Sequence, residues 1–123
     1  MKDKASLTSN NVEDIDDLTK KMCRACEGFD KPMNLKEAEK YLKKINNWKL
    51  IDNGKAIEKE FSFKDFKEAL EFVNKIGEIA EKEGHHPDIN LHSYKKVRVK
   101  LWTHAIKGLS ENDFIEAAKI DAI

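Results

Sequence analysis

The four histidines of the chain all lie between positions 85 and 104, and three of them have the types and spacing for proton transfer. His85 and His86 are adjacent, and His104 follows further along the chain. An imidazole has an unperturbed pKa of about 6.5, so it can give or take a proton near neutral pH. We therefore expect general acid–base chemistry, provided that the fold brings the three rings together.

These histidines belong to a longer pattern with fixed spacing. Its members are Glu81, His85, His86, Pro87, Tyr94, His104 and Asp113. This pattern resembles the signature of the pterin-4a-carbinolamine dehydratases. The resemblance extends from about Asn34 to the C-terminus and includes the endings THAIKGLSENDF and AAKID.

The resemblance implies a lyase that removes water from a 4a-hydroxytetrahydropterin. His85 and His104 would be the acid–base pair, His86 would bind and orient the pterin, and Glu81 would position or tune the histidines. The positions implied for substrate binding are His86, Pro87, Asp88, Trp102, Thr103 and Asp113. The pterin is the substrate, so we expect no cofactor and no metal.

Each of these residues also has a purely structural interpretation. A histidine pair just past a helix can stabilise the helix dipole, and Asp113 can be a helix cap. Pro87 can terminate a helix and His104 can simply end a strand. Outside the acid–base set, we expect Tyr94 to pack at a hairpin. His92 falls outside the pattern and is predicted to be an exposed strand residue.

A metal site is the competing chemical interpretation. Glu81, His85, His86 and His104 together could hold zinc or iron. Adjacent residues point in different directions, however, so the histidine pair chelates one ion poorly, and no HExxH motif is present. Cys23 and Cys26 form a CxxC, for which a redox pair, half of a zinc site and a reduced pair in a loop are all possible; we favour the last.

Length and charge set limits on the class of protein. The 123 residues suit one domain, and 23 basic residues balance 23 acidic ones. There is no net field to attract nucleic acid or a membrane surface directly. The sequence has neither an apolar run of the roughly 18 residues that span a membrane nor a signal-peptide core at its start. We expect a cytoplasmic protein.

The elements that must position the histidines can be read from apolar periodicity. Residues 1–33 are predicted to be a partly ordered arm, with Val12, Ile15, Leu18 and Met22 on one thin helical stripe. The domain proper is predicted over 34–123. Its first helix follows an Asn34–Glu37 capping box, and the second follows a Ser62–Asp65 box and stops near Gly84. The stripe predicted to be buried in the second helix is Phe66, Ala69, Leu70, Val73, Ile76, Gly77 and Ala80.

Strands are predicted on both sides of this long helix, at 48–51 and 56–63 before it and at 89–94 and 96–102 after it. A last helix opens at Ser110. The order αββαββα predicts an α+β fold, a four-stranded antiparallel sheet with three helices on one face. If the last two strands pair as a hairpin, His85, His86 and His104 converge at one end of the sheet.

Two further expectations concern partners. Because Phe61 and Phe63 lie on a predicted edge strand guarded only by Lys59, we expect a homodimer or homotetramer. Some members of the family that the chain resembles are dimerisation cofactors of a homeodomain transcription factor. A coactivator role, or service to molybdopterin metabolism instead of tetrahydrobiopterin recycling, therefore stays open.

Overall fold

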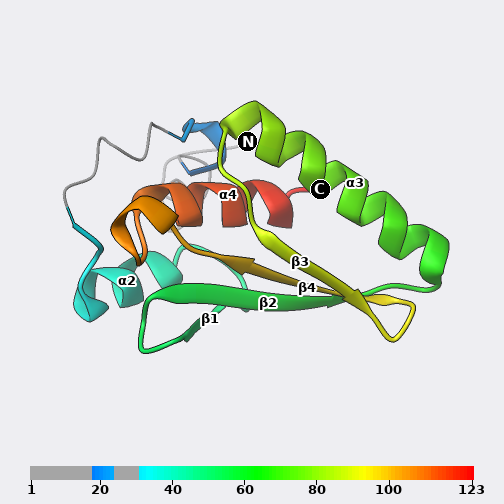
Figure 1. The fold of residues 1–123 in the computed structure, drawn as a ribbon, viewed down its shortest axis with the longest axis horizontal. Coiled ribbons are helices and arrows are strands. Elements are labelled where there is room, and N and C mark those ends of the chain that lie inside the picture. The colour runs from blue at the N-terminus through cyan, green and yellow to red at the C-terminus, as the bar shows by residue number, and fades with distance from the viewer. Residues whose placement is uncertain (1–17, 24–30) are drawn as a thin grey trace, which may run out of the picture.

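Strands and helices alternate as αββαββα, as predicted, in the computed structural model, which describes residues 18–23 and 31–123 (Figure 1). The elements are α2 (Leu35–Leu42), β1 (Lys49–Ile51), β2 (Ala56–Ser62), α3 (Phe66–Glu83), β3 (Asp88–His92), β4 (Lys96–Leu101), the 3-10 helix η2 (His104–Ile106) and α4 (Glu111–Asp121). The α+β prediction is confirmed.

The four strands form one antiparallel sheet in the order β1-β2-β4-β3. β3 and β4 pair as a hairpin, with Asp88 opposite Lys100 at one end and His92 opposite Lys96 at the other. β2 joins the two hairpins by pairing with β4. The prediction that β2 is an edge strand was therefore wrong, because β1 and β3 form the edges.

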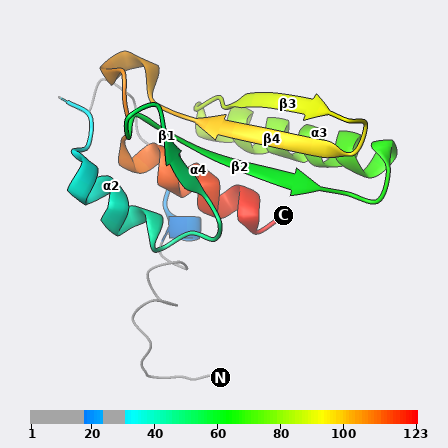
Figure 2. The same cartoon turned by 90° about the horizontal axis from the view of Figure 1, so that it is seen from below.

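Helices α3 and α4 lie on the same side of the sheet, which is seen almost edge-on in Figure 1 and from below in Figure 2. The core between these layers contains Ile57, Val97 and Val99 from the strands and Ile76 and Phe114 from the helices. β-Branched residues on the inner side of a strand pack well against helices. The alternating burial of β4 follows from this arrangement.

Side-chain caps fix where the helices begin. The capping boxes predicted at Asn34–Glu37 and Ser110–Asp113 are both present. The Ser62–Asp65 box is not, because Ser62 still pairs with Lys96 in the sheet. Asp65 caps α3 instead, accepting a hydrogen bond from the backbone N–H of Glu68.

The C-terminal end of α3 was predicted correctly. Gly84 adopts a left-handed conformation there, with φ at 67°, and its N–H donates to the carbonyl of Ala80. Glycine takes this conformation without the steric cost that other residues have. The turn directs the next two residues, His85 and His86, away from the helix axis.

The buried face of α3 differs from the predicted one. Phe66 and Leu70 are 49% and 42% exposed, whereas Phe72 is buried. The ring of Phe72 lies 4.7 Å from that of Phe61 and 4.8 Å from that of Phe63. The core stripe therefore passes through Phe72, and the two exposed side chains lie on its flank.

The described part of the N-terminal arm contacts the domain. Leu18 is buried in the core, whereas Met22 is exposed. Val12, Ile15 and Cys26 lie outside the described residues, and the predicted boundary at position 34 stays a prediction. Among the described residues, no helix is long and apolar enough to span a membrane.

Candidate functional site

His85 is a buried histidine, only 5% exposed, directly after the glycine turn that ends α3. Its Nε2 lies 2.7 Å from Oδ1 of Asp113, a residue in the first turn of α4. Because a carboxylate can only accept, Nε2 carries the hydrogen in this pair. The other ring nitrogen, Nδ1, is then the one that can accept a proton when the ring is neutral.

Asp113 is itself completely buried and surrounded by donors. Its Oδ2 accepts from the hydroxyl of Thr103 at 2.8 Å and from the backbone N–H of Ser110 at 2.9 Å. The Thr103 and Ser110 hydroxyls are also hydrogen-bonded to each other, 2.7 Å apart. Asp113 thus completes the capping box of α4 with Oδ2 and binds the ring of His85 with Oδ1.

The surroundings of His85 favour its charged form. Burial lowers the pKa of the ring, but the hydrogen bond and charge of Asp113, with a further contribution from Glu116, raise it above its ordinary value. Stabilisation of an imidazolium by a buried carboxylate is expected where the two make a direct hydrogen bond. His85 is therefore suited to hold a proton near neutral pH.

His104 follows Thr103 in the sequence and begins the 3-10 helix η2, and its side chain is exposed. Its ring stacks on Trp102 with the centroids 3.9 Å apart. The indole N–H of Trp102 donates to Asp88 at 3.4 Å. An open hollow of about 410 Å³ lies beside the stacked rings, and its lining residues are Asp52, Lys55, Ala56, Lys100, Trp102, His104 and Lys107.

The strand register brings His85 and His104 to the same end of the sheet. Asp88 pairs with Lys100, His85 comes three residues before Asp88, and His104 comes four after Lys100. Asp113 connects the two sides, because it binds His85 and also Thr103, the residue next to His104. The register thus places both residues at the same end of the sheet, as expected, with His85 buried and His104 exposed.

His86 and Glu81 form a separate, solvent-facing pair. Nε2 of His86 lies 2.6 Å from a carboxylate oxygen of Glu81, and their side chains are 63% and 78% exposed. Pro87, half-buried, follows directly. His85 and His86 are therefore held by different carboxylates, in keeping with the expectation that neighbouring residues point apart.

Two aromatic residues of this region lie elsewhere. Tyr94 is 61% exposed in the turn between β3 and β4, at the opposite end of the hairpin from His85 and His104, so the expectation that it packs there was wrong. His92 is half-buried and not simply exposed, since its Nε2 lies 2.6 Å from Glu60. Neither takes part in the His85–Asp113 network.

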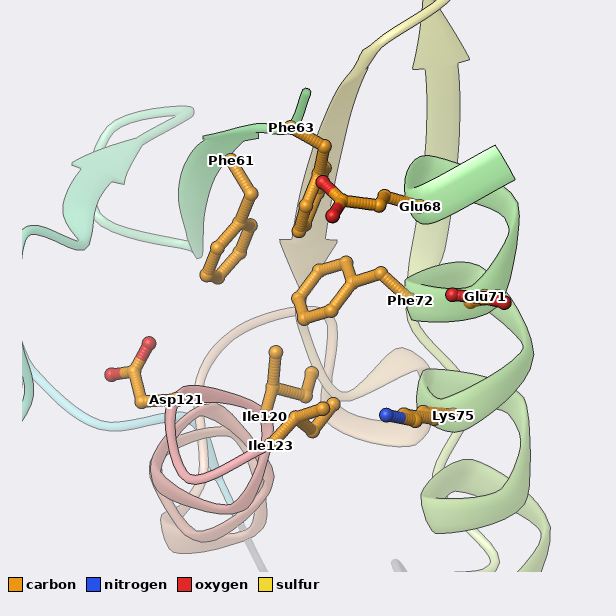
Figure 3. A pocket seen from close by; sticks show the side chains of 9 residues that line it. All are labelled: Phe61, Phe63, Glu68, Glu71, Phe72, Lys75, Ile120, Asp121 and Ile123. Carbon is orange, nitrogen blue, oxygen red and sulfur yellow. The ribbon is translucent and has the colours of Figure 1, made fainter. Parts of the chain in front are cut away.

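A second hollow, of about 390 Å³, lies between β2, α3 and the C-terminal end of α4 (Figure 3). Figure 3 shows Phe61, Phe63 and Phe72 on one side of it and Ile120 and Ile123 on the other. None of its lining residues is a histidine or another acid–base candidate of the sequence pattern. The hollow beside His104 is therefore the better candidate for substrate.

Residues that could hold a metal are not grouped together in the described ranges, 18–23 and 31–123, where no set of three or more His, Cys, Asp and Glu side chains is suitably placed. Cys23 is half-buried, and its thiol lies 3.6 Å from the carbonyl of Asn112. Burial raises the pKa of this thiol, with the charges of Glu116 and Glu83 acting in the same direction. Cys23 is thus held as the unreactive thiol.

The sequence analysis missed Glu116. It lies in α4 one turn after Asp113, with 0% of its side chain exposed. In the sequence it stands between apolar pairs, Phe114–Ile115 and Ala117–Ala118, and this was the available signal. An isolated acid within an apolar run is also compatible with a solvent-facing helix position, so the sequence did not single it out.

The chain matches the family model described as Pterin 4 alpha carbinolamine dehydratase over residues 31–123. It is 47% identical over 109 residues to a protein of Nitrosospira multiformis, provisionally named a pterin-4-alpha-carbinolamine dehydratase, with 89% of this chain and 94% of the relative covered. A protein of Alkaliphilus metalliredigens with the same provisional name is also 47% identical, over 87% of this chain and 96% of its own.

Solved structures agree with the fold. A crystal structure described as a transcriptional coactivator/pterin dehydratase from Brucella melitensis matches with a TM-score of 0.69 and 34% identity, covering 74% of this chain and 96% of its own. A pterin dehydratase-like protein described as a RuBisCO assembly factor in the alpha-carboxysome matches with a TM-score of 0.54 and 23% identity, over 63% and 88%. The second similarity concerns the fold alone.

Proposed function

The chain belongs to the pterin 4 alpha carbinolamine dehydratase family, and from this premise we propose that it converts a 4a-hydroxytetrahydropterin to the quinonoid dihydropterin in tetrahydrobiopterin recycling in the cytoplasm. The observation that carries the proposal is the pair of imidazoles at one end of the sheet. One is buried against Asp113 and the other is exposed beside a hollow.

The reaction requires one acid and one base. The C4a–O bond breaks and the hydroxyl leaves as water after it receives a proton, while the proton on N5 is removed as the C4a=N5 double bond forms. In this mechanism His85 and His104 exchange these two protons, and His86 with Glu81 binds and orients the pterin. Proton transfer of this kind contributes about 10²–10⁴-fold. Pro87, Asp88, Trp102, Thr103 and Asp113 would shape the substrate site.

We expect the purified protein to dehydrate a synthetic 4a-carbinolamine without any metal. The reason is that His85 and His86 are each bound by a different carboxylate through Nε2, and so cannot easily close on one ion. Stopped-flow absorbance measures the reaction, before and after dialysis against a strong chelator with the metal content determined each time. Absence of catalysis contradicts the function, and activity that is lost and then restored by zinc or iron contradicts the metal-free mechanism.

A protein-binding role is the second candidate function. The exposed Phe66 and Leu70, one turn apart on α3, offer an apolar surface of the kind that partners cover. The Brucella relative's description as a transcriptional coactivator points the same way. A catalytically inactive protein that still binds a partner would favour this role, and a pterin of molybdopterin metabolism is the alternative substrate.

We expect the chain to form a homodimer or a homotetramer. Since β2 is internal, we expect the interface between two copies of the chain to involve an edge strand or the exposed surface of α3. β3 is the longer edge strand. An exposed edge strand presents unpaired backbone groups that a second copy can pair with. Light scattering at micromolar concentration is expected to give at least twice the 14.2 kDa mass of one chain. A stable monomer would mean that both edges are protected within the chain.

A further inference from the structure

Glu116 is a completely buried carboxyl group for which neither the fold nor the proposed reaction provides a reason. Both of its oxygens, Oε1 and Oε2, are buried without a hydrogen-bond partner in the described part of the protein. A buried polar group without a partner costs folding free energy, and almost all such groups in native proteins are satisfied. Its presence in an otherwise apolar stretch of α4 therefore calls for an explanation.

Titratable groups from three parts of the chain surround Glu116. Asp113 and Lys119 lie on α4 itself, Glu83 and His85 come from the end of α3 and the turn after it, and Cys23 comes from residues 18–23. Lys119, a cation on the same helix, is already committed, because its Nζ lies 2.7 Å from Glu83. Glu83 also accepts the backbone N–H of Cys23 at 2.8 Å. Lys119 therefore balances Glu83, and the Glu116 carboxyl is left without an ion pair.

We propose that Glu116 is a positioning residue of the site, a buried carboxyl group one helical turn from Asp113 whose protonation is coupled to that of the His85 ring. The role is exerted through His85, and it rests on the proposed function only in assigning His85 to the reaction.

The protonation of Glu116 and the protonation of His85 each affect the other. Burial, with the charges of Asp113 and Glu83, raises the pKa of Glu116 to about 8, although His85 and Lys119 oppose this. A negative Glu116 in turn raises the pKa of His85. By linkage, each group alters the proton equilibrium of the other to the same extent. Near neutral pH Glu116 is mostly uncharged, and it becomes charged more readily whenever His85 is protonated.

The glutamine variant Glu116→Gln tests this coupling, because it keeps the size of the side chain and fixes it in an uncharged form. We expect the midpoint of the His85 titration, followed by ¹⁵N–¹H NMR of the imidazoles in the full chain, to fall by several tenths of a pH unit. The matched control is Glu78→Gln, an exposed glutamate on the same helix as Glu83, which should leave the midpoint unchanged. An identical midpoint in the wild type and Glu116→Gln would overturn the proposal.

A measurement on the wild type avoids dependence on the folding of the variant. With ¹³C labelling, the Glu116 carboxyl carbon should titrate well above the exposed glutamates and show a second inflection where His85 titrates. Titration together with the exposed glutamates would also overturn the proposal. Both readouts are independent of catalysis, so an inactive protein with coupled titrations refutes the proposed function alone. In an active enzyme, the kcat–pH limb assigned to His85 should move with its NMR midpoint.

Discussion

Replacing His85 or His104 by alanine is expected to lower kcat by about 10²-fold or more, while His86→Ala is expected to act mainly on KM. The first two residues lie at the same end of the sheet, and the proposed reaction assigns them the two proton transfers, whereas the third is exposed and bound to Glu81. Steady-state kinetics on a 4a-carbinolamine gives both constants. Full activity in the His85→Ala, His104→Ala double variant would exclude acid–base catalysis by these residues.

The fourth histidine provides a matched control. His92 bonds to Glu60 near the opposite end of the β3–β4 hairpin, so His92→Ala should leave kcat within a small factor of the wild type. His85→Ala also leaves Asp113 without one of its buried donors, at a cost of about 1–3 kcal/mol. The variant His85→Gln retains a donor in this place, and its kcat should remain low although its thermal stability recovers in part.

Glu116→Gln is expected to change how the stability of the protein depends on pH. The carboxyl has its ordinary pKa of 4.5 in the unfolded chain and about 8 in the folded one, so the folded state binds the proton more tightly. The contribution of Glu116 to stability therefore falls as the pH rises from 4.5 to 8 and then levels off, a loss of about 4–5 kcal/mol at 1.36 kcal/mol for each pKa unit. The amide has no such titration.

Urea unfolding of the wild type and Glu116→Gln at pH 4.5 and pH 9 measures this effect. The difference in unfolding free energy between the two proteins should shift by several kcal/mol in favour of the variant at the higher pH. Groups that are not coupled to Glu116 titrate alike in both proteins and cancel in the difference, and the shifted midpoint of His85 adds only a smaller change. Parallel pH dependences would mean that Glu116 is ionised at little cost in the folded protein.

Much of the fold could be predicted because its signals are local. The Asn34 and Ser110 caps and the stop at Gly84 each depend on neighbours in sequence. The order of the strands could not be predicted, since two hairpins can join along either edge. Ser62 was misassigned because its pairing with Lys96 comes from a distant strand and competes with the helix.

The candidate site likewise has features that could be predicted from the sequence and features that could not. The positions of His85 and His104 followed from hairpin pairing and alternation, so their convergence was predicted. The carboxylates were harder, because the partners of Asp113 depend on how α4 packs beside Thr103. Glu116 could not be found at all, since its burial results from tertiary contacts with the end of α3 and with residues 18–23.

Asp113 lies in the first turn of α4 and also binds His85, a candidate catalytic residue. Glutamine would also complete a capping box from this third helical position elsewhere, but only a carboxylate both accepts from Ser110 and stabilises a charged His85. In the proposed dehydratase, selection for a stable scaffold and selection for turnover would therefore act on the same side chain. A relative that has lost catalysis could replace this aspartate. An active enzyme could not gain thermal stability by substituting it, although the start of a helix is a usual place for stabilising substitutions.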